Sequence, residues 1–226
     1  MTTTRVRRRP LLPTGEPKPR FRGISHLYGF WVALALGAVL VVVAPGVEAR
    51  VLAGIYSVCA AAMLGCSALL HRGSWNEVQD RYLRQLDHSS IFLMIAGTYT
   101  PVTWYGMHGL MRWVVLAVVW CGAIFGITME WAPIRLPRGY ITAVYLIVGW
   151  TAVIALPWLW ESLGVAAFLG VVLGGVLYTI GAVIHAARKP DPAPDTFGYH
   201  EIFHVFVLLA ASVHYCVIAF AIIPRA

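Results

Sequence analysis

Charged residues are scarce in this chain, and their scarcity decides its class. Only 12% of the 226 residues are charged, whereas 59% are hydrophobic, and the mean hydropathy is +0.73. About a quarter of the residues of a soluble domain are charged. The composition therefore excludes an ordinary soluble protein and predicts an integral membrane protein, whose length allows about seven spans joined by short loops.

Lysine is also rare, and the chain has no CxxC motif. The two lysines, Lys18 and Lys189, lie outside the apolar runs, which excludes a retinal protein because its Schiff base requires a lysine within a span. None of the four cysteines belongs to a CxxC motif, so we expect buried free thiols. They are Cys59, Cys66, Cys121 and Cys216.

What the net charge of +7 indicates depends on where the basic residues lie. Seven of the seventeen precede the first apolar run: Arg5, Arg7, Arg8, Arg9, Lys18, Arg20 and Arg22. A basic segment beside a span is typical of a topology signal or of a contact with anionic lipid, so we expect no nucleic-acid partner. Residues 1–24 are polar and contain four prolines, which predicts a disordered, basic cytoplasmic tail, and residues 25–226 are expected to form one membrane domain.

Seven apolar runs follow, each close to the 17–25 residues that a bilayer crossing requires. The predicted spans are 25–44, 50–71, 86–105, 112–129, 139–156, 163–186 and 199–223. The first run is too long for a signal peptide and has no convincing cleavage site, so we expect it to be retained. The sequence thus predicts an all-α membrane protein, a seven-transmembrane-helix bundle.

Orientation follows from the basic residues outside the spans. If the amino terminus is cytoplasmic, the inner side carries fourteen Arg and Lys residues and the outer side carries three, Arg50, Arg112 and Arg225. Inner loops are enriched in basic residues. We therefore expect the N-terminus in the cytoplasm and, after seven spans, the C-terminus outside.

Two histidines four residues apart open the last span. His200 and His204 differ by about 40° around a helix and by about one turn along it, so they share a face. Histidine in a membrane helix is unfavourable unless it has a partner or a task. An i, i+4 pair suits two ligands of one metal ion. The alternatives are interhelical hydrogen bonds or two solvated interfacial side chains.

Three more polar residues are expected at the same depth. Ser67 and His71 close the second span and Asp87 opens the third, and the predicted topology brings both span ends to the inner leaflet. Each has a structural alternative: His71 as an interfacial side chain, Asp87 in a salt bridge with Arg81 or Arg84, and Ser67 as a small packing residue.

Together these residues predict a zinc site. Three neutral imidazoles, from His71, His200 and His204, leave a fourth tetrahedral position for water, as in catalytic zinc sites. Asp87 is expected to bind the metal or to act as general base on that water. Ser67 is expected to hold the aspartate or the water, or to donate to an oxyanion. Zinc suits this ligand set, although nickel, cobalt or iron would accept it.

The other histidines are not expected to bind this ion. His26 is a candidate for an outer contact, and His88 for an interhelical hydrogen bond. His214 lies ten residues beyond His204, about 15 Å along the helix, and is expected to bond to a neighbouring helix. Glu201 points away from the ligand face and is expected to neutralise a cytoplasmic arginine.

Four linked motifs resemble one family. They are Ser-x-x-x-His at 67–71, Leu-Asp-His at 86–88, Ile-Ala-Gly-Thr-Tyr-Thr-Pro at 95–101, and Phe-Gly-Tyr-His-Glu-Ile-Phe-His at 197–204. Over residues 24–223 the chain resembles the hemolysin III branch of the progestin and adipoQ receptor (PAQR) family. The resemblance implies zinc near the cytoplasmic side, bound by His71, His200 and His204, with Asp87 and Ser67 at the water.

The resemblance also implies an activity. Adiponectin receptors, the eukaryotic relatives, resemble alkaline ceramidases in this constellation. This implies zinc-dependent hydrolysis of an amide or ester bond in a membrane lipid, and a role in lipid homeostasis at the plasma (inner) membrane. The alternatives are a zinc-stabilised sensor or regulator without turnover, and a haemolysin-like pore. The ionisable residues gather at one side rather than tracing a path across the bilayer, which argues against the pore.

Overall fold

The computed structural model describes residue 11, residues 17–134, residue 137 and residues 139–225. Over this part the chain forms helices and no β-sheet, so the prediction of an all-α membrane protein is confirmed. The helices are α1 (Ile24–Val43), α2 (Gly46–Arg72), α3 (Glu77–Gly106), α4 (Gly109–Trp131), α5 (Tyr140–Trp150), α6 (Ala152–Leu163), α7 (Val165–Ala187) and α8 (Tyr199–Val217), followed by a π-turn (Ile218–Ile222) and a 3-10 turn (Ile223–Arg225).

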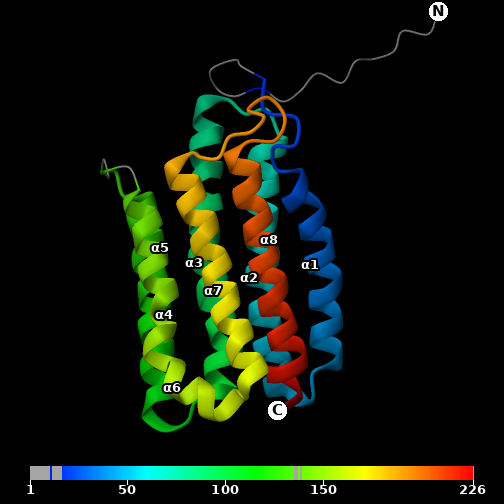
Figure 1. Ribbon diagram of the computed structural model, residues 1–226, viewed down its shortest axis with the longest axis vertical. Helices are drawn as coiled ribbons and strands as arrows, with labels where there is room; N and C mark the ends of the chain where they lie inside the picture. The colour runs from blue at the N-terminus through cyan, green and yellow to red at the C-terminus, as the bar shows by residue number, and fades with distance from the viewer. Residues whose placement is uncertain (1–10, 12–16, 135–136, 138, 226) are drawn as a thin grey trace, which may run out of the picture.

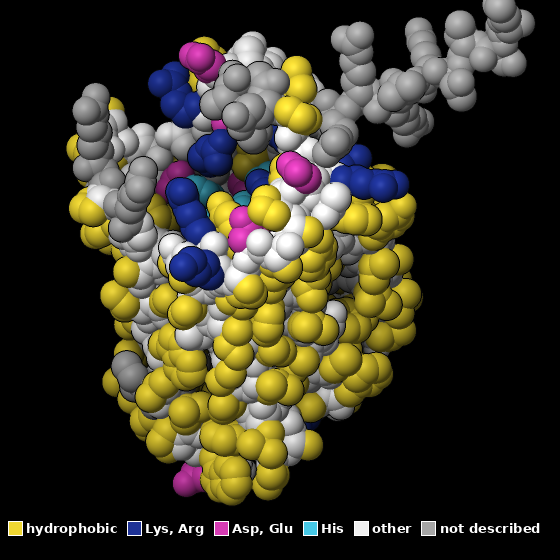
Figure 2. All heavy atoms as spheres, turned by 45° about the horizontal axis from the view of Figure 1, so that its top comes forward, with side chains coloured by type: hydrophobic (Ala, Val, Ile, Leu, Met, Phe, Trp, Pro, Cys, Tyr) yellow, Lys and Arg dark blue, Asp and Glu magenta, His cyan; other side chains and the backbone are white. Residues whose placement is uncertain are grey.

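The helices form one elongated bundle (Figure 1). Successive helices run in alternate directions, with α5 and α6 together making one pass, and the two ends of the chain emerge at opposite ends of the bundle. The face in Figure 2 is largely covered by hydrophobic side chains, whereas Lys and Arg gather at the end that carries the amino-terminal segment. This distribution suits a bundle whose sides face lipid.

Five helices, α1, α2, α4, α7 and the one that starts at Tyr199, are long and apolar enough to cross a membrane. The pair α5 and α6 makes a sixth candidate if it is counted as one broken span, since it bends by 47°. The predicted span 139–156 is therefore divided between two helices, α5 and α6. Two groups explain the break: the Thr151 hydroxyl donates to the Val148 carbonyl, and Pro157 offers no N–H to the carbonyl one turn earlier.

Helix α3 is more polar than the other long helices and is not among these candidates. It begins at Glu77 rather than at the predicted residue 86, because Asn76 and Gln79 form a capping box at its amino end. Its residues Phe92, Met94 and Ala96 are fully buried against neighbouring helices. A count of seven spans requires α3 to cross the membrane as well, so this count remains a prediction.

Part of the predicted disordered tail has defined contacts. Residues 17–23 lie across the amino-terminal end of the bundle: the amides of Arg20 and Phe21 donate to carbonyls of the α7–α8 loop, and the Lys18 ammonium donates to the carbonyls of Leu70 and Gly73 at 2.8 and 2.9 Å. The prediction of disorder over 1–24 therefore does not hold for 17–23. Residues 1–10 and 12–16 lie outside the described part.

Lys18 is buried, and this burial lowers the pKa of its ammonium group. The two carbonyl acceptors lie at the negative end of the α2 dipole and offset part of that unfavourable burial. They flank His71 in the sequence, so Lys18 holds the end of α2 that presents this histidine.

We expect the substitution Lys18→Met to destabilise the protein by about 2 kcal/mol, because two charge-assisted hydrogen bonds are lost. For a chain of this size that corresponds to a fall of about 4–8 °C in Tm, measurable by thermal unfolding in detergent. Lys189→Met, at the exposed second lysine, is the control and should leave Tm unchanged. Equal Tm values for the two variants would contradict the assigned role of Lys18.

Candidate metal centre

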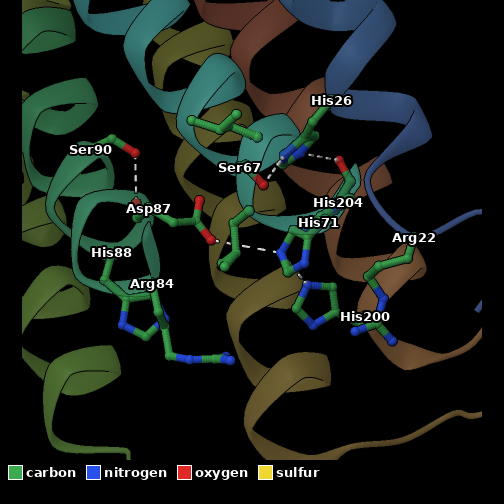
Figure 3. Close-up of polar contacts among 12 residues, drawn as sticks. Arg22, His26, Ser67, His71, Arg84, Asp87, His88, Ser90, His200 and His204 are labelled. Carbon is green, nitrogen blue, oxygen red and sulfur yellow. Dashed lines mark hydrogen bonds and ion pairs between the residues drawn. The ribbon is translucent and has the colours of Figure 1, made fainter. Parts of the chain in front are cut away.

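Three imidazoles meet at the amino-terminal end of the bundle (Figure 3). His71 comes from the last turn of α2, and His200 and His204 come from consecutive turns of α8. One nitrogen from each ring lies within 4.8 Å of the other two. The i, i+4 spacing therefore places both α8 histidines on one face, and α2 supplies the third.

The donor set fits a metal ion better than it fits a hydrogen-bonded cluster. The Nε2 atoms of His71 and His200 lie 3.1 Å apart, close to the ~3.3 Å between two ligands of a tetrahedral ion with zinc–nitrogen bonds of about 2.0 Å. In addition, the buried Nδ1 of His204 has no hydrogen-bond partner among the described residues. Converging neutral nitrogens of this kind suit zinc.

Asp87 approaches the cluster from α3. Its Oδ2 lies 3.7 Å from Nε2 of His71, and 14% of its side chain is exposed. That distance is too long for a direct hydrogen bond and leaves room for a bridging water. The structural alternative for Asp87 is not observed among the described residues, because Arg84 pairs with Asp80 one turn earlier.

Ser67 of α2 lies between His26 of α1 and Asp87 of α3. The Nε2 of His26 lies 3.3 Å from the carbonyl oxygen of His204; a carbonyl can only accept, so this nitrogen carries the proton. In the neutral ring Nδ1 is then an acceptor, and the Ser67 hydroxyl donates to it at 2.8 Å. Ser67 also lies within hydrogen-bonding reach of Asp87, as expected of a residue that holds the aspartate, and its donation to an oxyanion stays a prediction.

His26 is also stacked on His204. The two ring centroids are 3.8 Å apart and the ring planes differ by 12°. Together with Ser67, this contact fixes the orientation of the His204 imidazole. The expectation of an outer contact for His26 matches this geometry, but the stacking had no signal in the sequence.

A buried carboxylate holds the start of α8. Glu201 accepts from the side chain of Arg22 and from the amide of Gly198, which satisfies a free N–H group at the helix end. Glu201 therefore neutralises an arginine at this end of the bundle, as expected, and it anchors the turn that carries His200. Arg22 was not identified from the sequence, because its partner lies 179 residues away.

The remaining histidines mostly behave as expected. His88 pairs with Glu130 of α4 at 3.0 Å, and His214 bonds to the Val171 carbonyl of α7. The ring of His185 lies 5.1 Å from that of His200, centroid to centroid, so α7 also contacts the centre. All four cysteines are free, but Cys121 and Cys216 are exposed rather than buried.

A mainly apolar cavity leads away from the histidines. Along α3 its lining extends from Asp87 to Thr103, a rise of about 24 Å. The other walls come from α1, α2, α5, α6, α7 and α8. The candidate metal centre lies at one end of this cavity.

A second, polar pocket lies on the other side of the histidines, towards the basic end of the bundle. His71 and His200 line it together with basic side chains from three segments, Lys18, Arg22, Arg84 and Arg188. Figure 2 shows this hollow, with histidine visible between Lys and Arg side chains. The candidate centre is therefore open to polar groups from one side and to hydrocarbon from the other.

Similar sequences are found in bacteria and in eukaryotes. The family model described as "Haemolysin-III related" matches residues 15–215. Hemolysin-3 of Bacillus cereus is 34% identical over 160 residues, covering 71% of this chain and 70% of its own length; the Hemolysin-3 homolog of Bacillus subtilis is also 34% identical, over 69% of this chain and 70% of its own. The adiponectin receptor protein of Drosophila melanogaster is 31% identical over 84% of this chain and 48% of its own length.

Proposed function

This chain belongs to the haemolysin-III-related family, and from that premise we propose that it is a metal-dependent hydrolase of amide or ester bonds in membrane lipids. Zinc is the metal that we propose, and the plasma (inner) membrane the location. We also propose that the basic end of the bundle is cytoplasmic, since basic residues favour that side.

One observation supports the proposal above the others: three imidazole nitrogens and a carboxylate meet at the end of an apolar cavity. A histidine cluster with a purely structural role needs neither a long apolar cavity nor a carboxylate beside it. Here the carboxylate is that of Asp87, and among the described residues it forms no ion pair with an arginine. The polar pocket gives water and a lipid headgroup access from one side, while the cavity accepts an acyl chain from the other.

The residues have distinct roles in this proposal. His71, His200 and His204 would hold the metal, which would supply a Lewis acid for the scissile carbonyl and for an attacking water. Asp87 takes the proton of that water as general base. It then returns the proton to the leaving amine or alcohol. The hydroxyl of the water ends on the acyl group, so the products are a fatty acid and the protonated leaving group.

Two residues position the ligands in this mechanism. His26 stacks on His204, and Ser67 donates to His26. Outer contacts of this kind orient metal-binding histidines and typically change metal affinity by about 10–100-fold. We therefore propose Ser67 as a positioning residue rather than as an oxyanion donor.

The decisive experiment combines metal analysis with a lipid assay on protein purified without a histidine tag. We expect about one zinc per chain, and release of fatty acid from an acyl-amide or acyl-ester in a panel of membrane lipids. A chelator should abolish the release, and added zinc should restore it. Protein that contains no metal and gains none from a zinc-containing buffer would overturn the proposal.

The second candidate function is a metal-stabilised sensor or regulator without turnover. It is favoured by the fact that the three ligands would join α2 to α8, so that the metal could act as a structural tie. Stoichiometric zinc with no product from any lipid of the panel would favour this candidate over the hydrolase.

A further inference from the structure

Three buried side-chain nitrogen or oxygen atoms have no hydrogen-bond partner within the described part of the chain, and their residues all line the same cavity. One is Nδ1 of His204, which belongs to the candidate metal centre. The other two are the hydroxyl of Tyr178 on α7 and Nδ1 of His214 on α8. The rings of these two residues lie near each other, with centroids 5.8 Å apart.

This second pair lies deep in the bundle. His214 is ten residues beyond His204 on α8, a rise of about 15 Å. That is about half of the ~30 Å hydrocarbon core of a bilayer, and close to the depth of one leaflet. A buried polar group without a partner is unfavourable at such a depth, so this pair calls for an explanation.

The hydrogen bond of His214 defines what its free nitrogen can do. Nε2 lies 3.2 Å from the carbonyl oxygen of Val171, and because a carbonyl only accepts, Nε2 carries the proton. In the neutral imidazole Nδ1 is then an acceptor. The Tyr178 hydroxyl can both donate and accept. The pair therefore presents one acceptor and one donor, the complement of a single hydroxyl group.

The surroundings of the pair are specific rather than accidental. A Cβ at position 174 would overlap the imidazole of His214, so Gly174 lets this ring lie against α7. Other polar side chains of the same cavity have partners within the protein: Thr98 and Thr179 donate to carbonyls of their own helices, and Tyr99 donates to the Gly149 carbonyl. The free donor and acceptor are thus concentrated at Tyr178 and His214.

We propose that Tyr178 and His214 bind a hydroxyl group on the distal part of a hydrocarbon chain in the cavity. The ligand hydroxyl donates to Nδ1 of His214 and accepts from the O–H of Tyr178. The inference rests on the proposed function for one point only, that the occupant is an acyl chain whose carboxyl end lies at the histidines. The site then selects acyl chains that carry a hydroxyl about 15 Å from the reacting bond.

Fatty-acid binding tests the proposal without any need for turnover. The probes are stearic acid and hydroxystearic acids with the hydroxyl in the distal half of the chain, titrated by calorimetry into the full-length, metal-loaded protein. We expect the best hydroxy acid to bind about tenfold more tightly than stearic acid, equivalent to about 1.4 kcal/mol. Tyr178→Phe should bring this ratio close to one while leaving the affinity for stearic acid unchanged.

Two further variants complete the test. His214→Leu removes the acceptor and should also abolish the preference, which keeps the test decisive if Tyr178→Phe does not fold. Tyr145→Phe is the matched control, because Tyr145 lines the same cavity but its hydroxyl interacts with Thr142 on its own helix; the preference should persist in this variant.

The outcomes separate this site from the proposed enzyme. Equal affinities of the wild-type protein for stearic and hydroxystearic acids would overturn the hydroxyl site and leave an ordered water as the partner of the pair. A hydroxyl preference in a protein that hydrolyses no lipid would support the site and contradict the hydrolase. Failure of every fatty acid to bind would overturn the hydroxyl site, whereas release of fatty acid in the lipid assay would still support the hydrolase.

Discussion

Replacing His204 by alanine is expected to remove most of the bound metal. His204 is fully buried between His26 and the other two imidazoles, so no other side chain can take its place. Loss of an outer contact alone changes metal affinity by about 10–100-fold, and loss of a ligand should therefore lower it by at least about a hundredfold. Hydrolysis should fall below detection with it.

The same variant should be less stable in detergent. At a free metal concentration of about 100 times Kd, binding stabilises the folded state by about 2.7 kcal/mol, which corresponds to about 5–10 °C in Tm for a chain of this size. Metal content measured by elemental analysis and Tm should fall together. His108→Ala, an exposed histidine at the start of α4, is the control. Unchanged zinc content in His204→Ala would exclude this residue as a ligand.

Replacing Asp87 by asparagine should separate binding of the metal from turnover. Asparagine has the shape of aspartate but cannot accept a proton, so the three histidines should retain zinc while kcat falls. General-base catalysis typically contributes about 10²–10⁴-fold, and we expect a loss in that range. The measurement is initial rate of fatty-acid release, with zinc content determined on the same preparation.

Asp80→Asn is the matched control for that substitution. Asp80 lies on α3 as well, and its partner is Arg84 on the same helix rather than a histidine of the centre. Its loss should change kcat by only a few-fold. Full activity of Asp87→Asn would exclude Asp87 as the base, and loss of zinc from it would make Asp87 a ligand instead.

The meeting of the three histidines could be predicted from the sequence, whereas most of the residues that support them could not. His71, His200 and His204 were identifiable because helix geometry relates residues four apart, and because alternating spans bring the end of one and the start of another to one depth. Neither residue spacing nor the predicted topology identifies His26 or Arg22 as a support of the histidines. Their partners lie 178 or 179 residues away, and local patterns carry no information on contacts at such separation.

Two features of the fold could have been predicted more closely. Asn76 and Gln79 have the spacing of a capping box, and this signal would have placed the start of α3 at Glu77. The predicted span 139–156 ends just before Pro157, but this proline lies inside α6. A proline without a neighbouring cap indicates a break as readily as an end, and the structure has the break at Thr151.

The ion pair between Arg22 and Glu201 can form only after nearly the whole chain has been translated. The segment 17–23 leaves the ribosome early, whereas its partners on the α7–α8 loop and α8 are made near the end of synthesis. At roughly 5–20 residues per second, the 179 residues between Arg22 and Glu201 take about 10–40 seconds to synthesise. In the nascent chain, residues 20–22 therefore lack these partners until α8 has been made.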